Sequence, residues 1–351
     1  MMAAAGFLKL TGARLPIVQA PMANFAGREL AIATIGSGGV GSLACAVLDA
    51  TAMVAEVTAI RAAVAGPLNL NFFCHTLGAQ PDETAWRSAL VPFYAEEGVD
   101  PPTGSPPLRR PFDLAMAEAL DWARPEIVSF HFGLPDQDLL ARVRATGALI
   151  FGNATTLAEA RHLAGHGCDA VIVQGVEAGG HAGHFLDDYR SVPLDELLPQ
   201  VVSAIDVRVI AAGGIADAAS VSAAMAHGAA AVQAGTAYLL TPETWTSAVH
   251  RRRLGTGSAD DLVATNLFTG GIARGLRNRL IDALGPINPA APPFPYASAA
   301  LAPLRAKAER EGRGDFSPLW AGGGVARARA EPAADVTTRL GNAALNFRSE
   351  S

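Results

Sequence analysis

Short apolar runs recur along the first two-thirds of the chain, and most are followed by a segment whose apolar residues are spaced as on one face of a helix. The runs predict eight strands, at residues 16–19, 40–44, 68–73, 127–132, 148–152, 170–174, 208–212 and 230–233. Alanine-rich stretches with helical periodicity lie between most of them, for example at 155–166 and 216–227. Parallel strands that are covered on both faces have this nearly continuous apolar character.

The alternation of strands and helices predicts a parallel sheet, and the number of strands favours a closed barrel. An open, doubly wound sheet is the alternative. No G-x-G-x-x-G follows the first strand, which disfavours a Rossmann dinucleotide site. We therefore expect an α/β protein built on a (β/α)8 TIM barrel, with a small, mainly helical substrate or cap domain.

Two regions do not fit a minimal barrel. Residues 75–126 separate the third and fourth strands and contain Pro101-Pro102, Pro106-Pro107 and Pro111, which predicts a structured excursion or lid. Residues 245–324 are rich in proline and glycine and have helical pieces, which predicts a cap. The expected division is a barrel over 1–244 with the excursion at 75–126, a helical cap over 245–324, and a C-terminal segment, 325–351, whose helix at 333–345 returns to the barrel.

Composition narrows the classes of function. The chain has 351 residues, of which 50% are hydrophobic, so it can bury a full core. Its net charge of -6 argues against nucleic acid as a partner. Three cysteines without metal-type spacing fit a reducing cytoplasm. Residues 216–240 are apolar but interrupted by polar residues, and no secretory segment is visible, so we expect a soluble, cytoplasmic protein with no membrane partner. Oligomeric state is not indicated.

Candidate chemistry gathers at the predicted strand ends, where a (β/α)8 barrel has its active site. Glycine-rich turns follow the seventh and eighth strands, at Gly213-Gly214 and Gly235-Thr236. Such turns can offer backbone N–H groups to a phosphate, although each could also be only a tight turn. The pair at adjacent strands favours phosphate binding.

Other strand ends suit a flat ring. The segment Ala20-Pro21-Met22 forms an apolar platform, although Met22 alone could be core filler. Asn71 and Gln174 carry amides that match the polar edge of a flavin. Together with a phosphate site, these residues suggest a flavin mononucleotide (FMN) site.

Histidines divide into two groups. His162, His166, His227 and His250 fall on predicted helices, where packing or surface roles are expected, whereas His75, His131, His181 and His184 fall at or just beyond strand ends. His181 is the first candidate for a base, because Gly179 and Gly180 remove steric bulk beside it. His131 is the second, with a structural role as the alternative. No H-E-x-x-H helix or carboxylate partner supports a metal site.

Seven of these segments, in this order, resemble nitronate monooxygenases, formerly called 2-nitropropane dioxygenases, and most closely class I of bacteria and fungi. They are QAPM at 19–22, NFFCH at 71–75, SFHFG at 129–133, QGVEAGGHAG at 174–183, AAGGI at 211–215, AVQAGTAYL at 231–239 and ARGLRN at 273–278. Each motif alone is weak, but seven in register across most of the chain are specific.

The resemblance implies a (β/α)8 barrel with bound FMN. It implies oxidative denitrification of alkyl nitronates, such as propionate 3-nitronate, by O2 to carbonyl compounds and nitrite through a flavin semiquinone. The family's catalytic histidine matches His181, and a second histidine that lines the substrate pocket matches His131. Its flavin contacts match Ala20, Pro21, Met22, Asn71, Gln174, Gly179, Gly180, Gly213, Gly214, Gly235 and Thr236.

The chain departs from the family pattern at several positions. Ala182 replaces a frequent arginine, Gly270-Gly271 lacks a common serine, and Gly323 stands where glutamine is frequent. Arg274, in the ARGLRN segment, could replace the missing cation, although a structural salt bridge is the expected role for a lone arginine. Two other functions stay open: an FMN-dependent NAD(P)H enoyl-thioester or quinone reductase on the same barrel, and a non-catalytic barrel that binds a flavin or another phosphate ligand.

Overall fold

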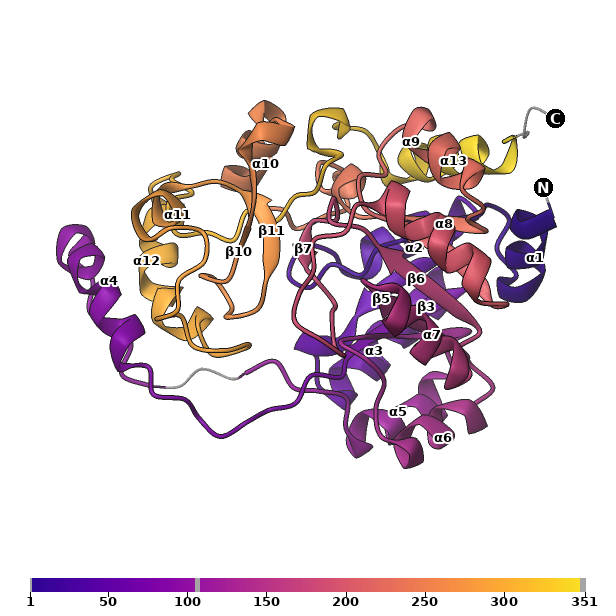
Figure 1. Ribbon diagram of the computed structural model, residues 1–351, viewed down its shortest axis with the longest axis horizontal. Helices are drawn as coiled ribbons and strands as arrows, with labels where there is room; N and C mark the ends of the chain where they lie inside the picture. Colours follow the sequence, from indigo (N-terminus) through magenta and orange to yellow (C-terminus); the bar gives the residue numbers. More distant parts are fainter. Residues whose placement is uncertain (1, 105–107, 348–351) are drawn as a thin grey trace.

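The computed structural model describes residues 2–104 and 108–347, and it is built around a parallel sheet of eight strands in the order β1-β9-β8-β6-β5-β4-β3-β2 (Figure 1). The strands are β1 (Ile17–Gln19), β2 (Gly41–Ala44), β3 (Leu68–Phe73), β4 (Ile127–His131), β5 (Leu149–Ala154), β6 (Ala170–Gln174), β8 (Arg208–Ala212) and β9 (Ala231–Ala234). All eight strands predicted from the sequence are therefore present, with boundaries shifted by two residues at most.

The first and last strands of this order meet and close the sheet into a barrel. Val18 bridges Val40 in the parallel sense. The Val40 N–H donates to the carbonyl of Ile17 over 2.9 Å, and the Gln19 N–H donates to the carbonyl of Val40 over 3.0 Å. The predicted (β/α)8 barrel is confirmed, and the open, doubly wound alternative is wrong.

The barrel interior is filled by branched and aromatic side chains. Val18, Ile127, Phe151 and Ile210 are fully buried in one cluster. Helix α1 (Met2–Thr11) precedes β1 and adds Phe7 to the same cluster. The barrel is thus a packed core and not a pore, as in other barrels of this type.

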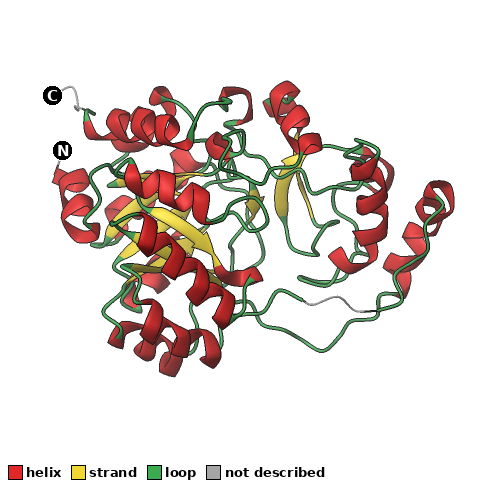
Figure 2. Cartoon of the chain, turned by 180° about the vertical axis from the view of Figure 1, so that it is seen from behind, coloured by secondary structure: helices red, strands yellow, loops and turns green. Residues whose placement is uncertain are grey.

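Helices cover the outside of the sheet (Figures 1 and 2). They are α2 (Arg28–Gly36), α3 (Ala50–Ala63), α5 (Leu114–Ala123), α6 (Gln137–Ala145), α7 (Leu157–Gly165), α8 (Leu194–Ala204), α9 (Ala218–Ala226) and α13 (Ala333–Leu345). Several begin where a side chain accepts a bond from the first turn, such as Asp49 for α3, Thr156 for α7 and Asp217 for α9. Helix α13 packs against α9, α2 and β1, so the end of the chain returns to the barrel.

A second lobe lies beside the barrel (Figure 1). It contains α4 (Thr84–Glu97), α10 (Ala248–Thr256), α11 (Arg279–Leu284) and α12 (Ser298–Arg310), and a three-stranded sheet of β10 (Leu262–Thr265), β11 (Ala273–Leu276) and β7 (Gly180–His181). Along the whole described chain, short 3-10 helices span Cys45–Val47, Thr236–Tyr238, Ala259–Asp261 and Val325–Arg327. The small sheet was not predicted from the sequence.

Helix α4 belongs to this lobe, although it lies in the segment between β3 and β4. Its Trp86 indole N–H donates to the carbonyl of Ala297 over 3.1 Å, and Tyr94 donates to that of Ala300 over 2.5 Å. Two long connections carry the chain out to α4 and back (Figure 1). Pro106-Pro107, part of the predicted excursion, and 348–351, the end of the predicted C-terminal segment, lie outside the described residues. Within 2–104 and 108–347, each helix is too short or too polar to cross a lipid bilayer.

Candidate active site

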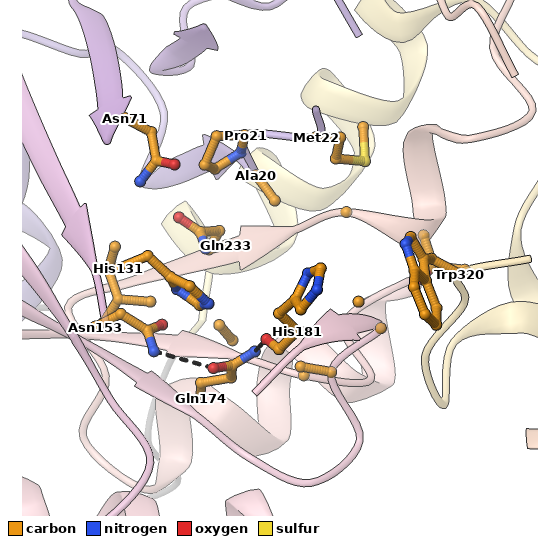
Figure 3. Close-up of a pocket in the computed structure, with 18 of the residues that line it drawn as sticks. Ala20, Pro21, Met22, Asn71, His131, Asn153, Gln174, His181, Gln233 and Trp320 are labelled. Atoms are coloured by element: carbon orange, nitrogen blue, oxygen red, sulfur yellow. Dashed lines mark hydrogen bonds between the residues drawn. The ribbon is translucent and has the colours of Figure 1, made fainter. Parts of the chain in front are cut away.

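The C-terminal ends of the barrel strands border one cavity (Figure 3). Among its lining residues are Ala20, Pro21, Met22, Asn71, His131, Gln174, Gly179, Gly180, His181, Gly213, Gly214, Gly235 and Thr236. These are all of the site residues predicted from the sequence, and they come from six different strand ends. Their convergence is an observation, whereas their roles toward a flavin or a substrate stay predictions.

The Gly-Gly-His turn is held between the barrel and the small sheet. Strand β7, which contains His181, pairs antiparallel with β11. From the barrel side, the Gln174 amide nitrogen donates to the carbonyl of His181 over 2.8 Å, and its amide oxygen accepts from the Gly183 N–H over 2.9 Å (Figure 3). Gln174 therefore fixes the backbone around His181, in addition to lining the cavity.

Glycine is required in this turn for two separate reasons. Gly180 has a φ of 77°, a conformation that costs little only for glycine. At Gly179, a Cβ atom would lie 2.6 Å from the backbone of both Ala321 and Gly322. The turn and the loop at 321–324 can pack this closely only because neither presents a side chain at the contact.

The His181 imidazole lies among aromatic rings and has one polar partner. Its Nε2 lies 2.8 Å from the hydroxyl oxygen of Thr269. Ring centroids of Phe294, Trp320, Phe132 and Phe73 lie 5.1, 5.8, 6.2 and 6.3 Å away. Burial lowers the pKa of His181 well below 6.5, and the charge of Arg109 and the neighbouring histidines His131 and His75 lower it further. The imidazole is therefore neutral near pH 7.

His131 ends β4 and lies in the same wall of the cavity (Figure 3). Burial lowers its pKa to about 4, with His184 adding to the effect and the His181 backbone opposing it. The next residue, Phe132, has a φ of 66°, an unfavourable conformation for an aromatic residue. That conformation places the Phe132 ring against His131, with centroids 4.5 Å apart.

Amide side chains lie on the barrel side of the cavity (Figure 3). Asn71 donates to the Ser129 hydroxyl over 2.9 Å, and its carbonyl oxygen is not used in that bond. Gln233 in β9 has a buried amide oxygen with no hydrogen-bond partner among the described residues. Because an unpaired buried acceptor is costly, Gln233 is suited to a ligand with an N–H donor.

The two glycine turns after β8 and β9 border the cavity as predicted. Gly213 and Gly214 have φ values of 123° and 68°, so both require glycine. The Thr236 hydroxyl accepts from the Gly322 N–H over 3.0 Å, which leaves its own proton free to donate. The N-terminus of α9 is already capped by Asp217, so an anion would be bound by the turn itself and not by this helix.

The positions that depart from the family pattern lie around this cavity and not in its lining. Ala182 and Arg274 line a small neighbouring pocket, and Gly270-Gly271 lines another. Arg274 donates through Nε to the carbonyl of Val176 over 2.6 Å. This bond gives Arg274 a structural role, but through a backbone carbonyl and not through the salt bridge that was expected, since Arg274 forms no ion pair among the described residues.

Several lining residues were not predicted from the sequence. Phe73, Arg109, Asn153, Gln233 and Trp320 line the cavity, and Thr269 contacts His181. Two of them lie inside motifs that were singled out for other residues, because Phe73 neighbours Asn71 and Gln233 precedes Gly235. Thr269 and Trp320 lie beside Gly270-Gly271 and Gly323, and Asn153 lies near the end of β5, but nothing in the sequence marked them as site residues. Arg109 is far from any motif, and only the folded chain brings it to the cavity.

Metal ligation has no support from side-chain clusters in the part of the chain that the structure describes. No group of three or more His, Cys, Asp or Glu residues there could hold an ion. The cavity lining offers the imidazoles of His131 and His181, the Glu177 carboxylate, the Arg109 guanidinium, amides, hydroxyls and aromatic rings. A barrel with a titratable group at the C-terminal ends of its strands is the architecture of a barrel enzyme.

Comparison with known proteins identifies the family. The nitronate monooxygenase family model matches residues 7–340. A nitronate monooxygenase of Pseudomonas aeruginosa is 38% identical over 341 residues, which cover 95% of this chain and 97% of that protein. The chain belongs to the nitronate monooxygenase family, as the resemblance in the sequence predicted.

Solved structures agree with this assignment. The structure of nitroalkane oxidase from Streptomyces ansochromogenes has a TM-score of 0.88 and 35% identity, and the match covers 98% of this chain and 99% of that one. FabK from Thermotoga maritima matches with a TM-score of 0.71 and 20% identity over 97% of this chain and 96% of that one. The second likeness shows the fold alone.

Proposed function

We propose that this chain binds FMN and uses O2 to convert alkyl nitronates to carbonyl compounds and nitrite. The observation that carries the proposal is the position of His181, whose imidazole lies among aromatic rings at the mouth of a barrel of this family. Propionate 3-nitronate is the substrate expected from the family resemblance. When bound, the flavin supplies an acceptor for the electrons of the nitronate.

The residues of the cavity fit FMN. The unpartnered amide oxygen of Gln233 and the free carbonyl oxygen of Asn71 suit the N–H groups at the edge of the ring. Gly213-Gly214 and Gly235-Thr236 would hold the phosphate through backbone N–H groups and the Thr236 hydroxyl. Ala20-Pro21-Met22 would lie against the ring as an apolar surface.

The proposed role of His181 is to remove the α-proton of a neutral nitroalkane. A base must be unprotonated to accept a proton, and the lowered pKa keeps His181 in that state near pH 7. If Nε2 carries the proton and donates to Thr269, then Nδ1 has the lone pair that accepts the proton. Once protonated, the imidazolium would stabilise the nitronate anion. His131 would line the substrate pocket.

Replacing His181 with Asn tests this role. We expect the purified variant to keep its FMN, because His181 is not among the residues proposed to hold the phosphate or the ring edge. Its kcat/KM for nitroalkanes should fall by roughly 100-fold or more, since a general base contributes about that much. His184→Asn is the matched control, because His184 lines a neighbouring pocket and not this cavity. Unchanged nitroalkane kinetics in the His181 variant would rule the role out.

A further inference from the structure

Arg109 lies in the wall between two cavities. It lines the main cavity together with His181, and it also lines the adjoining cavity together with Arg305 and Trp320. Its backbone is held by His75, whose Nε2 lies 3.1 Å from the carbonyl oxygen of Arg109. The guanidinium is close enough to His181 for its charge to lower the pKa of the imidazole.

The Arg109 charge has no acidic partner among the described residues. Other arginines show the usual arrangement: the neighbouring Arg305 pairs with Glu309 at 2.8 Å, and Arg313 of the second lobe pairs with Glu97 at 2.6 Å. Within 2–104 and 108–347, Arg109 takes part in no ion pair of this kind, although burial and the charge of Arg305 lower its pKa. Arg109 is half-buried, and a guanidinium that is partly removed from water without an acidic partner is suited to an anion supplied from elsewhere.

We propose that Arg109 selects the substrate by binding a carboxylate that the nitronate carries on a short tail. This inference rests on the proposed function, because it assumes that a nitronate reacts beside His181. A guanidinium binds a carboxylate through two parallel hydrogen bonds. The two carboxylates that line these cavities are bonded elsewhere: Glu177 accepts from the Leu194 N–H, and Glu309 accepts from Arg305 and Ser317. Arg274 does not take this role, since it is bonded to Val176 outside the cavity.

The test compares two nitronates that differ in their tails. The holoenzyme, Arg109→Gln, Arg109→Lys and the control Arg110→Gln, whose side chain is exposed, are assayed with propionate 3-nitronate and with the uncharged 1-propyl nitronate. In Arg109→Gln, kcat/KM for propionate 3-nitronate should fall roughly 10- to 100-fold, and kcat/KM for 1-propyl nitronate should stay within about twofold. In Arg109→Lys, kcat/KM for propionate 3-nitronate should fall less, because lysine keeps the positive charge but lacks the paired N–H donors of the guanidinium. Arg110→Gln should match the wild type.

Two further readouts complement the comparison of the two nitronates. Binding of propionate to the holoenzyme, measured by calorimetry, should be lost in Arg109→Gln and retained in Arg110→Gln. Removing a positive charge near His181 should also raise the pKa of the imidazole, so the acid limb of the nitroalkane pH profile should move to higher pH.

The outcomes separate this inference from the proposed function. Equal losses on both nitronates, or propionate binding that Arg109→Gln leaves intact, would overturn the assignment of Arg109. If the wild type turns over neither nitronate but propionate binding depends on Arg109, the proposed function fails and the carboxylate site stands. If Arg109→Gln does not fold, Arg109→Lys decides: a loss on propionate 3-nitronate alone supports the assignment, and equal kinetics on both contradict it.

Discussion

Burial lowers the pKa of His181, and so do the charge of Arg109 and the neighbouring histidines His131 and His75. Sequence reasoning found His181 because a Gly-Gly-His turn after an apolar strand is a local pattern, readable from consecutive residues. It could not find the role of Thr269, which is 88 positions away: this residue precedes Gly270-Gly271, but nothing in the local sequence marks it as a partner of His181. Arg109 was missed for the same reason. A polar residue that acts through space leaves no periodic or spaced signal in the chain.

The hydroxyl of Thr269 gives a prediction at this scale. Thr269→Val keeps the shape of the side chain but removes the group that lies 2.8 Å from Nε2 of His181. The imidazole then loses the partner that orients it, so kcat for a nitroalkane should fall by roughly tenfold, with little change in KM, given that a hydrogen bond is worth about 1–1.5 kcal/mol. Steady-state kinetics check this, with Thr58→Val on the exposed face of α3 as the control. Equal kinetics in the two variants would mean that Thr269 does not position His181.

Elements with strong patterns were predicted well, and short ones were not. The eight barrel strands are apolar runs bounded by turns, and the structure contains all of them. Strand β7 has only two residues, Gly180 and His181, so no alternation can reveal it. Its pairing with β11 depends on a partner more than 90 positions further along the chain, at Ala273 and Arg274. This pairing sets the position of the backbone at His181.

The contact between the turn at Gly179 and the loop at 321–324 can be tested at the scale of elements. A Cβ atom in Gly179→Ala would lie 2.6 Å from the backbone of Ala321 and Gly322, so one segment must move. We expect a loss of about 1–3 kcal/mol in the free energy of unfolding and reduced FMN content after purification. Gly165→Ala, at the end of α7 where a Cβ atom would meet no described neighbour within 4 Å, should change neither. Denaturant unfolding and flavin absorbance measure both effects, and wild-type values for Gly179→Ala would refute the close contact.

The whole molecule assembles its cavity from positions spread between Ala20 and Gly324. The barrel class followed from the order of elements, and in a barrel of this class the C-terminal ends of all the strands lie together at one face. The packing of the second lobe did not follow, because α4 joins α12 through contacts such as Trp86 with Ala297, 211 positions apart. Arg109 lies on the connection that returns from α4 to the barrel. The barrel class therefore allowed the residues at the strand ends, which are proposed to hold the flavin, to be predicted from the sequence. The contribution of Arg109 could be seen only in the folded chain.

The most direct test of the central proposal is anaerobic mixing of the purified protein with propionate 3-nitronate, followed by the visible flavin spectrum, with NADH and NADPH in parallel. The proposal predicts an FMN spectrum in the protein as purified, and loss of the oxidised absorbance with the nitronate alone. Admission of O2 should then restore the oxidised spectrum and release nitrite. Loss of absorbance only with NADH or NADPH would contradict the proposal and favour a reductase. Absence of a flavin spectrum after reconstitution with FMN would contradict both.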